Sequence, residues 1–294
     1  MYTERGYIVQ IKITDITNYA AEMIRTASSG FIHSVYQHTM NIQTDKGLIA
    51  LQSPGSVISP ISLIASQDLD ILNLCSISQG VPVQPGYESI HIMTPRSMTL
   101  SWKDAALHDP FLFAQTGKEE ICGLSGLLNQ VITSGQKGFC QLFAPVSDQN
   151  DSPILTIARR RLEDCSRLLS EKSYLPAAVQ IAKLIGLGIG LTPSGDDFLC
   201  GVLAGLQLMS LKNHPFAHAL KKEISSHLSD TNDISAAFLS CALKNMYSQP
   251  VLSLASMESP SRILREFSRI GHSSGMDTLC GVYYILTQEH SLIC

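Results

Sequence analysis

Two segments of the chain repeat one short phrase, and each copy reads as the start of a helix that carries a carboxylate. Residues 194–202 read SGDDFLCGV and residues 274–282 read SGMDTLCGV, with seven of nine positions identical. Repetition of this kind predicts two equivalent structural elements. Unpaired N–H groups at a glycine-lined helix start, together with the positive end of the helix dipole, can hold a small anion. We therefore expect an anion site where two such elements face each other.

Glycine and small polar residues crowd around both copies. The approach to the first copy, residues 186–193, reads GLGIGLTP and holds more glycine than a helix cap requires. A further polar cluster, residues 229–235, lies between the copies. The candidate anion-binding residues are Gly188, Gly190, Thr192, Ser194, Gly195, Asp196, Thr231, Ser235, Ser273, Ser274 and Gly275.

A purely structural interpretation of the repeat is also open. Ser194 with Asp197, and Ser274 with Asp277, match the capping-box pattern, in which the serine accepts a hydrogen bond from the backbone three residues on. Apolar residues at helical spacing follow each cap. The repeated glycine (Gly201 in the first copy) would let another backbone approach closely. Residues 229–235 can likewise be a helix cap and nothing more.

Other motifs give weaker signals. The glycines of residues 186–190 are followed by neither the G-K-S/T of a Walker loop nor the third glycine of a dinucleotide fingerprint, so a nucleotide site is not predicted. His214 and His218 have the spacing of a metal pair, but Pro215 lies between them and no third ligand is evident. The sequence predicts no metal and no cofactor.

Composition indicates a compact globular protein. Of 294 residues, 45% are hydrophobic and 16% are charged, and the net charge of −4 argues against a nucleic-acid partner. Eight scattered cysteines without a C-x-x-C pair fit a reducing compartment. The N-terminus does not resemble a signal peptide, and the longest apolar run, residues 198–209, is too short to span a membrane. We expect a cytoplasmic protein with no membrane partner.

The first hundred residues read mainly as strands. Residues 31–43 are rich in β-branched residues and lead through Asp45-Lys46-Gly47 into residues 48–51, which predicts a hairpin. Two more strands are predicted at residues 89–93 and 97–102. Helical spacing at residues 14–26 predicts one helix among these strands.

Beyond about residue 115 the apolar spacing becomes helical. Helices are predicted at residues 121–132, 154–169, 175–185, 217–228, 234–246, 261–270 and 278–286, with a surface loop at residues 144–153. The chain is therefore predicted to be α+β, with a β-rich N-terminal domain at residues 1–110. A mostly α-helical domain at residues 111–294 then carries the duplicated loop–helix element.

The phrases GLGIGLTPSGDDFLCG, TNDIS and GHSSGMDTLCG together resemble the AllH-type family, most strongly over residues 180–285. The named member of that family is a subunit of oxamate carbamoyltransferase. The resemblance implies a reversible carbamoyl transfer, in which oxalurate and phosphate give oxamate and carbamoyl phosphate in the breakdown of allantoin, a purine catabolite. It also implies an FdrA-like partner and a further small subunit.

In such a reaction Asp197 and Asp277 are expected to accept hydrogen bonds from the carbamoyl NH₂ group. His272 is expected to polarise the carbonyl or to carry a proton, although it can also be a solvent-exposed histidine at a helix entrance. Two alternatives stay open. The chain can be a non-catalytic assembly subunit, or an unrelated small-acid or phosphate enzyme with a divalent ion such as Mg²⁺ between Asp196, Asp197 and Asp277.

Overall fold

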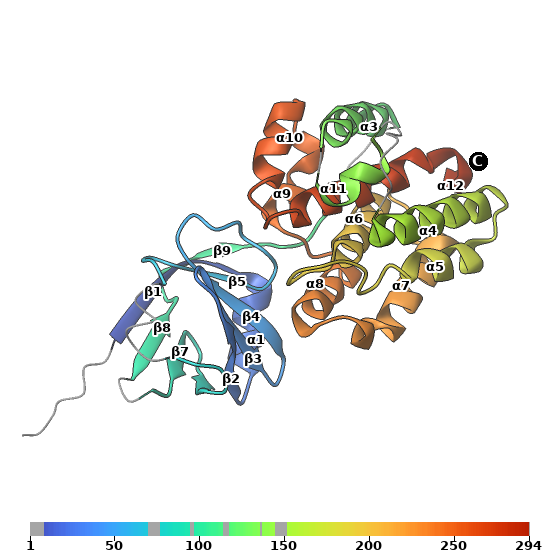
Figure 1. Ribbon diagram of the computed structural model, residues 1–294. Coiled ribbons are helices and arrows are strands. Elements are labelled where there is room, and N and C mark those ends of the chain that lie inside the picture. Colours follow the sequence, from blue (N-terminus) through green and yellow to red (C-terminus); the bar gives the residue numbers. More distant parts are fainter. Residues whose placement is uncertain are drawn as a thin grey trace, which may run out of the picture. The chain divides into compact units, whose positions relative to one another are not determined.

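The chain forms two compact units, Met1–Pro110 and Phe111–Cys294, in a computed structural model. The structure describes residues 9–69, 77–94, 97–113, 118–135, 137–144 and 152–293. The first unit is built of strands and the second almost entirely of helices (Figure 1), which confirms the predicted α+β class.

In the described part of the first unit, nine strands form a sheet that closes into a barrel (Figure 1). The strand order is β5-β4-β3-β2-β6-β7-β8-β1-β9, and β5 also pairs with β1, which joins the two sides of the sheet. The strands are β1 (Val9–Thr17), β2 (Gly30–Val35), β3 (Thr39–Thr44), β4 (Gly47–Gln52), β5 (Ser62–Ala65), β6 (Pro82–Pro85), β7 (Ser89–Ile92), β8 (Met98–Ser101) and β9 (Ala106–His108). Closure leaves few strand edges open to other chains.

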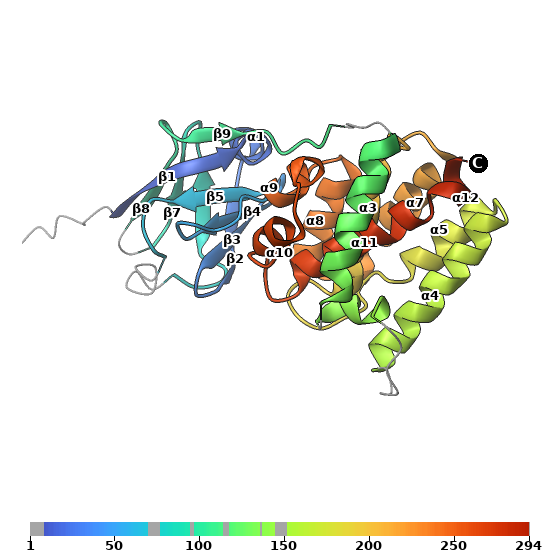
Figure 2. The ribbon, with the colours of Figure 1, turned by 90° about the horizontal axis from the view of Figure 1, so that it is seen from above.

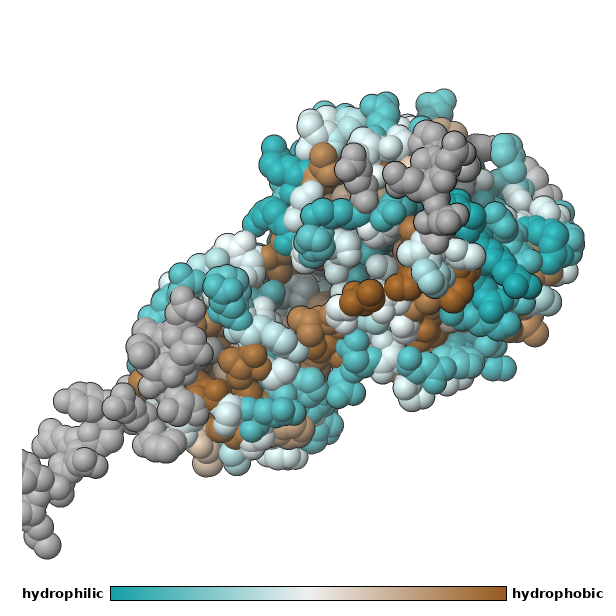
Figure 3. Space-filling view, viewed as in Figure 1, coloured by the Kyte–Doolittle hydropathy of each residue, from teal (hydrophilic) through white to brown (hydrophobic). Residues whose placement is uncertain are grey.

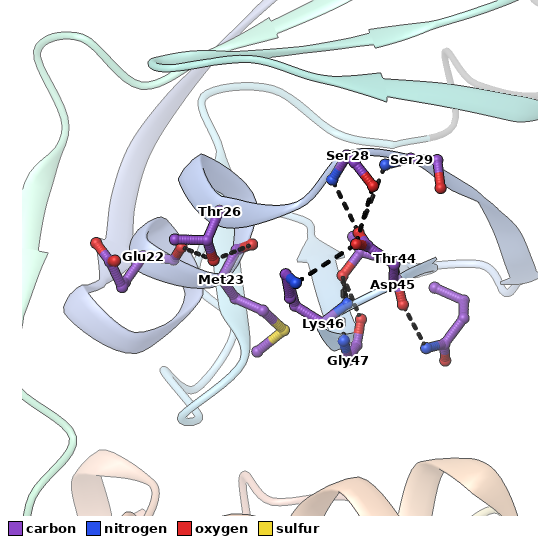
Figure 4. Close-up of polar contacts among 10 residues, drawn as sticks. Glu22, Met23, Thr26, Ser28, Ser29, Thr44, Asp45, Lys46 and Gly47 are labelled. Carbon is purple, nitrogen blue, oxygen red and sulfur yellow. Dashed lines mark hydrogen bonds and ion pairs between the residues drawn. The ribbon is translucent and has the colours of Figure 1, made fainter.

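The predicted hairpin is confirmed at β3 and β4. Thr44 pairs with Gly47, so Asp45 and Lys46 form a two-residue turn. Figure 4 shows how side chains hold this turn: the Thr44 hydroxyl oxygen accepts the N–H groups of Lys46 and Gly47, each at 3.1 Å. The Asp45 carboxylate accepts the backbone N–H of Ser28 at 2.9 Å. The turn is therefore fixed by hydrogen bonds as well as by its glycine.

Two predictions for the first unit are wrong in their limits. Residues 31–43 form two antiparallel strands, β2 and β3, instead of one. The helix predicted at residues 14–26 begins only at Asn18 (α1, Asn18–Thr26), because the residues before it continue β1 and pair with β5. Thr17 ends the strand and caps the helix by accepting the Ala20 N–H at 3.1 Å. The strands predicted at residues 89–93 and 97–102 are confirmed as β7 and β8.

The second unit confirms all seven predicted helices to within a few residues. Its elements are α3 (Lys118–Thr133), η1 (Gly138–Leu142), α4 (Pro153–Ser170), α5 (Tyr174–Ala182), α6 (Ser194–Leu208), α7 (Pro215–Ser226), η2 (Leu228–Asp230), α8 (Asp233–Leu243), α9 (Gln249–Leu252), η3 (Leu254–Ser256), α10 (Pro260–Phe267), α11 (Ser274–Thr287) and α12 (Glu289–Ile293). Most of the surface loop predicted at residues 144–153, namely 145–151, lies outside the described residues. Among the described helices, none has the length and apolar character needed to cross a bilayer.

The two repeated helices, α6 and α11, form the centre of this unit. Both are buried along most of their length, and α11 runs through the interior of the helical unit in Figure 2. They pack by reciprocal contacts of their glycines. A Cβ atom on Gly201 would collide with the Thr278 carbonyl oxygen, and one on Gly281 would collide with the Phe198 carbonyl oxygen. Since Thr278 occupies in the second copy the place of Phe198 in the first, the contact is pseudo-two-fold.

This packing gives a first testable prediction. Gly281→Ala is expected to lower the free energy of unfolding by about 1–3 kcal/mol or more, because the added methyl group forces two backbones apart. Urea denaturation of the full chain measures the change. The matched control is Gly126→Ala on α3, where the added Cβ meets nothing within 4 Å apart from the adjacent backbone of its own helix. The control should gain roughly 0.5–1 kcal/mol from helix propensity. Equal stabilities of the two variants would contradict the reciprocal contact.

Candidate functional site

The starts of α6 and α11 meet, as the repeated phrase predicts. The hydroxyls of Thr192, before α6, and Ser274, at the start of α11, lie 2.8 Å apart and join the two loops. The Asp197 carboxyl interacts with the Ser274 hydroxyl, and the Asp277 carboxyl interacts with the Ser194 hydroxyl. Each copy of the phrase therefore supplies a hydroxyl to the carboxyl of the other copy.

The predicted capping boxes are wrong. The residue before α6 is Pro193 and the residue before α11 is Ser273, and neither provides a side-chain cap. Ser194 and Ser274 are the first residues of their helices, one position after the cap. Their hydroxyls therefore do not accept the backbone N–H of Asp197 or Asp277. The Asp197 N–H donates instead to the Pro193 carbonyl at 3.3 Å. The serine and aspartate side chains do not cap their own helices. Each interacts with a side chain of the other copy.

Several N–H groups that were expected to bind an anion already have partners. The Gly195 N–H donates to the Leu187 carbonyl at 2.8 Å, and the Gly275 N–H donates to the Ile270 carbonyl at 3.0 Å. The Asp277 N–H donates to the Ser273 carbonyl at 2.8 Å. In this conformation the helix starts bind their own approach loops. Among the described site residues, the buried side-chain oxygens without a hydrogen-bond partner are Asp197 Oδ2, Asp277 Oδ2 and Ser235 Oγ.

Asp196 ties the glycine-rich loop to α8. Its Oδ1 accepts the Gly186 N–H at 2.8 Å, and its Oδ2 accepts the Thr231 hydroxyl at 2.5 Å. The buried Ser235 hydroxyl lies close enough to lower the pKa of this carboxyl, but its Oγ makes no hydrogen bond to a described residue. Asn232 caps α8 by accepting the N–H groups of Ile234 and Ser235. The cluster at residues 229–235 thus caps α8 and also donates a hydrogen bond to Asp196. Both carboxyl oxygens of Asp196 accept hydrogen bonds.

Asp197 and Asp277 form the central pair. Only 9% of Asp197 and none of Asp277 is exposed to solvent. Among the described residues, Oδ2 of each has no hydrogen-bond partner, although a buried, unsatisfied polar atom costs about 1–3 kcal/mol. The negative charge of Asp277 raises the pKa of Asp197, so the two carboxyls lie within range of an electrostatic interaction. The unsatisfied oxygens are the atoms of this site with free capacity to bind a ligand.

Burial raises the pKa of both carboxyls. The pKa of Asp197 lies well above its ordinary value of 3.8, mainly through burial; the Thr192 and Ser274 hydroxyls oppose this rise, and the negative charge of Asp277 adds to it. Burial also raises the pKa of Asp277, and the Phe139 N–H opposes that rise. The pair can therefore hold or transfer a proton at a higher pH than an exposed aspartate can.

The sequence interpretation missed two residues that hold Asp277. The Phe139 N–H donates to Asp277 Oδ1 at 2.6 Å across 138 residues of sequence. Gly138 has φ +55°, and a Cβ atom there would collide with the Asp277 carboxyl. A glycine just after a predicted helix was the only available signal, and it points to a turn without naming the partner.

The remaining candidate residues lie at the edge of this site. Gly188 and Gly190 have φ values of +143° and +117°, which side chains rarely adopt, and Gly188 lies against the Ser194 backbone nitrogen. His272 is exposed, and no hydrogen bond from it to the described residues is found. Neighbouring Ser273 interacts with Asp277. His272 as a proton carrier stays a prediction.

The described residues contain no group of three or more His, Cys, Asp or Glu side chains arranged to hold a metal ion. His214 caps α7 by accepting the Phe216 N–H at 3.2 Å. Asp196 is engaged by Gly186 and Thr231, so a divalent ion between Asp196, Asp197 and Asp277 would have to displace these bonds.

These observations define a class: a two-part α+β protein whose helical part joins two copies of a loop–helix phrase around a carboxyl pair. The sequence model described as "Oxamate carbamoyltransferase subunit AllH" matches residues 184–286, which include both copies. The model described as "AllH family N-terminal domain" matches residues 11–107, which include the barrel. The chain belongs to the AllH family. No curated protein and no solved structure matches it.

The raised pKa of Asp197 predicts a pH-dependent stability difference. Between the unfolded pKa of 3.8 and the higher folded pKa, the folded chain holds a proton that the unfolded chain releases, so ionisation favours unfolding as pH rises. Asp197→Asn removes this effect. The stability of the variant relative to the wild type should therefore rise with pH from about pH 4 until the folded pKa is passed, by at most roughly 1.4 kcal/mol per pH unit.

Melting temperatures measured by calorimetry across this pH range test the prediction. Glu163→Asn, at an exposed position on α4, is the control and should follow the wild-type profile. A constant difference between Asp197→Asn and wild type at every pH would show that burial does not raise the Asp197 pKa.

Proposed function

We propose that this chain is the subunit of a carbamoyltransferase that binds the carbamoyl group, and that the pair of Asp197 and Asp277 is the binding site. The observation that carries the proposal is the pair of buried Oδ2 atoms without partners, at the junction of two helix starts. A bound ligand that forms hydrogen bonds with these oxygens would offset the cost of burying them. The family description supplies the reaction class.

The substrates proposed from that description are oxalurate and phosphate, which give oxamate and carbamoyl phosphate in allantoin degradation. A phosphate oxygen attacks the carbamoyl carbon of oxalurate, and the bond from that carbon to the oxamate nitrogen breaks. The proton lost by phosphate ends on the leaving nitrogen. A carboxyl whose pKa is raised by burial, as that of Asp197 is, suits this proton transfer. His272, exposed at the entrance of α11, is the second candidate proton carrier.

Access to the site requires movement. Both Oδ2 atoms are shielded from solvent, so a ligand contacts them only after the loops before α6 and α11 separate. The hydroxyl pair of Thr192 and Ser274 is a direct bond between these loops. Positive φ angles at Gly188, Gly190 and Gly271 place glycine on both loops. We propose that an FdrA-like partner and a further small subunit complete the enzyme.

A second candidate function, a non-catalytic assembly subunit, is favoured by the same shielding and by exposed apolar side chains on the glycine-rich loop. Ile189 is 86% exposed and Leu191 is 53% exposed. In Figure 3, apolar areas interrupt the polar surface on the visible face of the helical unit. Under this alternative the loops bind a partner protein and the carboxyl pair serves only the fold.

The two functions are separated by transfer assays on the full chain, alone and reconstituted with its partner subunits. With oxamate and carbamoyl phosphate, phosphate release should fall about a hundredfold or more in Asp197→Ala and Asp277→Ala, since positioned acid–base groups contribute on the order of 10²–10⁴-fold. Glu163→Ala, on the exposed face of α4, should keep full activity.

Circular dichroism and gel filtration of each variant complete the test. Folded, assembled variants with undiminished transfer would refute the catalytic proposal. Loss of assembly with Ile189→Ser and Leu191→Ser, with transfer unaffected by the aspartate substitutions, would establish the scaffold function instead.

A further inference from the structure

The two carboxyls of the pseudo-two-fold site differ in one respect: among the described residues, a backbone N–H donates to one of them, while hydroxyls surround both. Asp277 Oδ1 accepts a backbone N–H, that of Phe139, at 2.6 Å. Hydroxyls interact with both carboxyls: those of Ser194 and Ser273 with Asp277, and those of Thr192 and Ser274 with Asp197. The backbone of Gly138 leaves no room for a side chain beside Asp277, so this turn is fitted to one carboxyl of the pair.

This difference decides where a proton resides. A backbone N–H can only donate, so it stabilises a carboxylate and disfavours a carboxylic acid. A hydroxyl can donate to a carboxylate or accept from a carboxylic acid, so it tolerates both forms. The donors therefore favour ionisation at Asp277 and permit a neutral acid at Asp197.

The other charges around the pair act in the same direction. Asp196 and Asp277 both disfavour a negative charge on Asp197. Asp196 itself accepts a backbone N–H, that of Gly186, which favours its ionised form. Cys200 and Cys280 lie one turn along their helices, and burial raises the pKa of both thiols, so they stay neutral. No cation contributes to the ionisation of either carboxyl among the described residues.

We propose that Asp197 is a carboxylic acid and Asp277 a carboxylate at neutral pH, and that together they recognise the planar H₂N–C=O group of a carbamoyl or carboxamide compound. The inference rests on the proposed function and deepens it. Asp277 Oδ2 accepts a ligand N–H, and the Asp197 O–H donates to the ligand carbonyl oxygen. Both unsatisfied oxygens then have partners. A carboxylate of the same shape is rejected, because its oxygen would face the Asp277 carboxylate.

Asparagine substitutions distinguish the two carboxyls. Asn has the donor and acceptor of a carboxylic acid, so Asp197→Asn preserves the recognition. In Asp277→Asn the Phe139 N–H holds the amide oxygen, which turns the amide NH₂ toward the ligand and replaces an acceptor with a donor. The same conservative change is therefore mild at one position and severe at the other.

Infrared spectroscopy of the full chain at neutral pH tests the protonation directly and needs no ligand. The wild type should show the C=O band of a buried carboxylic acid. The band should be lost in Asp197→Asn and kept in Asp277→Asn and Asp196→Asn. Absence of the band from the wild type, its persistence in Asp197→Asn or its loss in Asp196→Asn would overturn the assignment.

Binding by the reconstituted complex provides the second measurement, with oxamate and its isostere oxalate as probes. Wild type and Asp197→Asn should bind oxamate within about threefold of each other and at least about tenfold more tightly than oxalate, a difference of roughly 1.4 kcal/mol. Asp277→Asn should lose this preference. Equal effects of the two asparagine substitutions would overturn the inference while leaving the carbamoyltransferase proposal intact. That proposal fails separately, if the alanine variants transfer carbamoyl groups normally.

Discussion

Everything at the site depends on the close backbone contact between α6 and α11. Gly201 and Gly281 let each helix touch a carbonyl oxygen of the other, and only glycine leaves room for this approach. The contact lies one to two turns beyond the helix starts. It therefore fixes the distance between those starts, and with it the distance between Asp197 and Asp277. A larger side chain at either glycine would separate the helices and the carboxyl pair together.

The same contact explains why the site is costly to form. The two helix starts meet with their carboxyl groups facing the interior. Burying two acidic groups in a medium of low dielectric constant costs free energy. Hydroxyls from both copies and one backbone N–H compensate only part of that cost, and one oxygen of each group is left without a partner. A duplicated element selected only for packing would have apolar residues in place of Asp197 and Asp277, as both copies have at the buried equivalent positions Leu199 and Leu279. The retained carboxyls are therefore the strongest structural indication that the helical unit has a binding function.

Much of the fold could be predicted from the sequence, since apolar spacing and turn residues are local signals. The β3–β4 turn and the helices of the second unit follow from such signals. The start of α1 could not be predicted from local signals. Pairing of β1 with β5 extends the strand to Thr17, although the spacing of apolar residues there is helical. The predicted capping boxes were wrong for a related reason: the Ser194 and Ser274 hydroxyls interact with the opposite copy, and a local pattern cannot show a partner that is distant in the sequence. The turn at Gly138 and Phe139 is equally non-local, so its role at Asp277 needed the structure.

A double-mutant cycle on the free energy of unfolding tests most directly whether the two repeated helix starts place Asp197 and Asp277 side by side. The cycle compares wild type, Asp197→Asn, Asp277→Asn and the double variant by urea denaturation at neutral pH. Neighbouring carboxyls predict that the double variant departs from the sum of the single effects by more than about 0.5 kcal/mol, whereas distant sites add within roughly 0.3–0.5 kcal/mol. Additive effects would contradict the convergence of the two copies on one site.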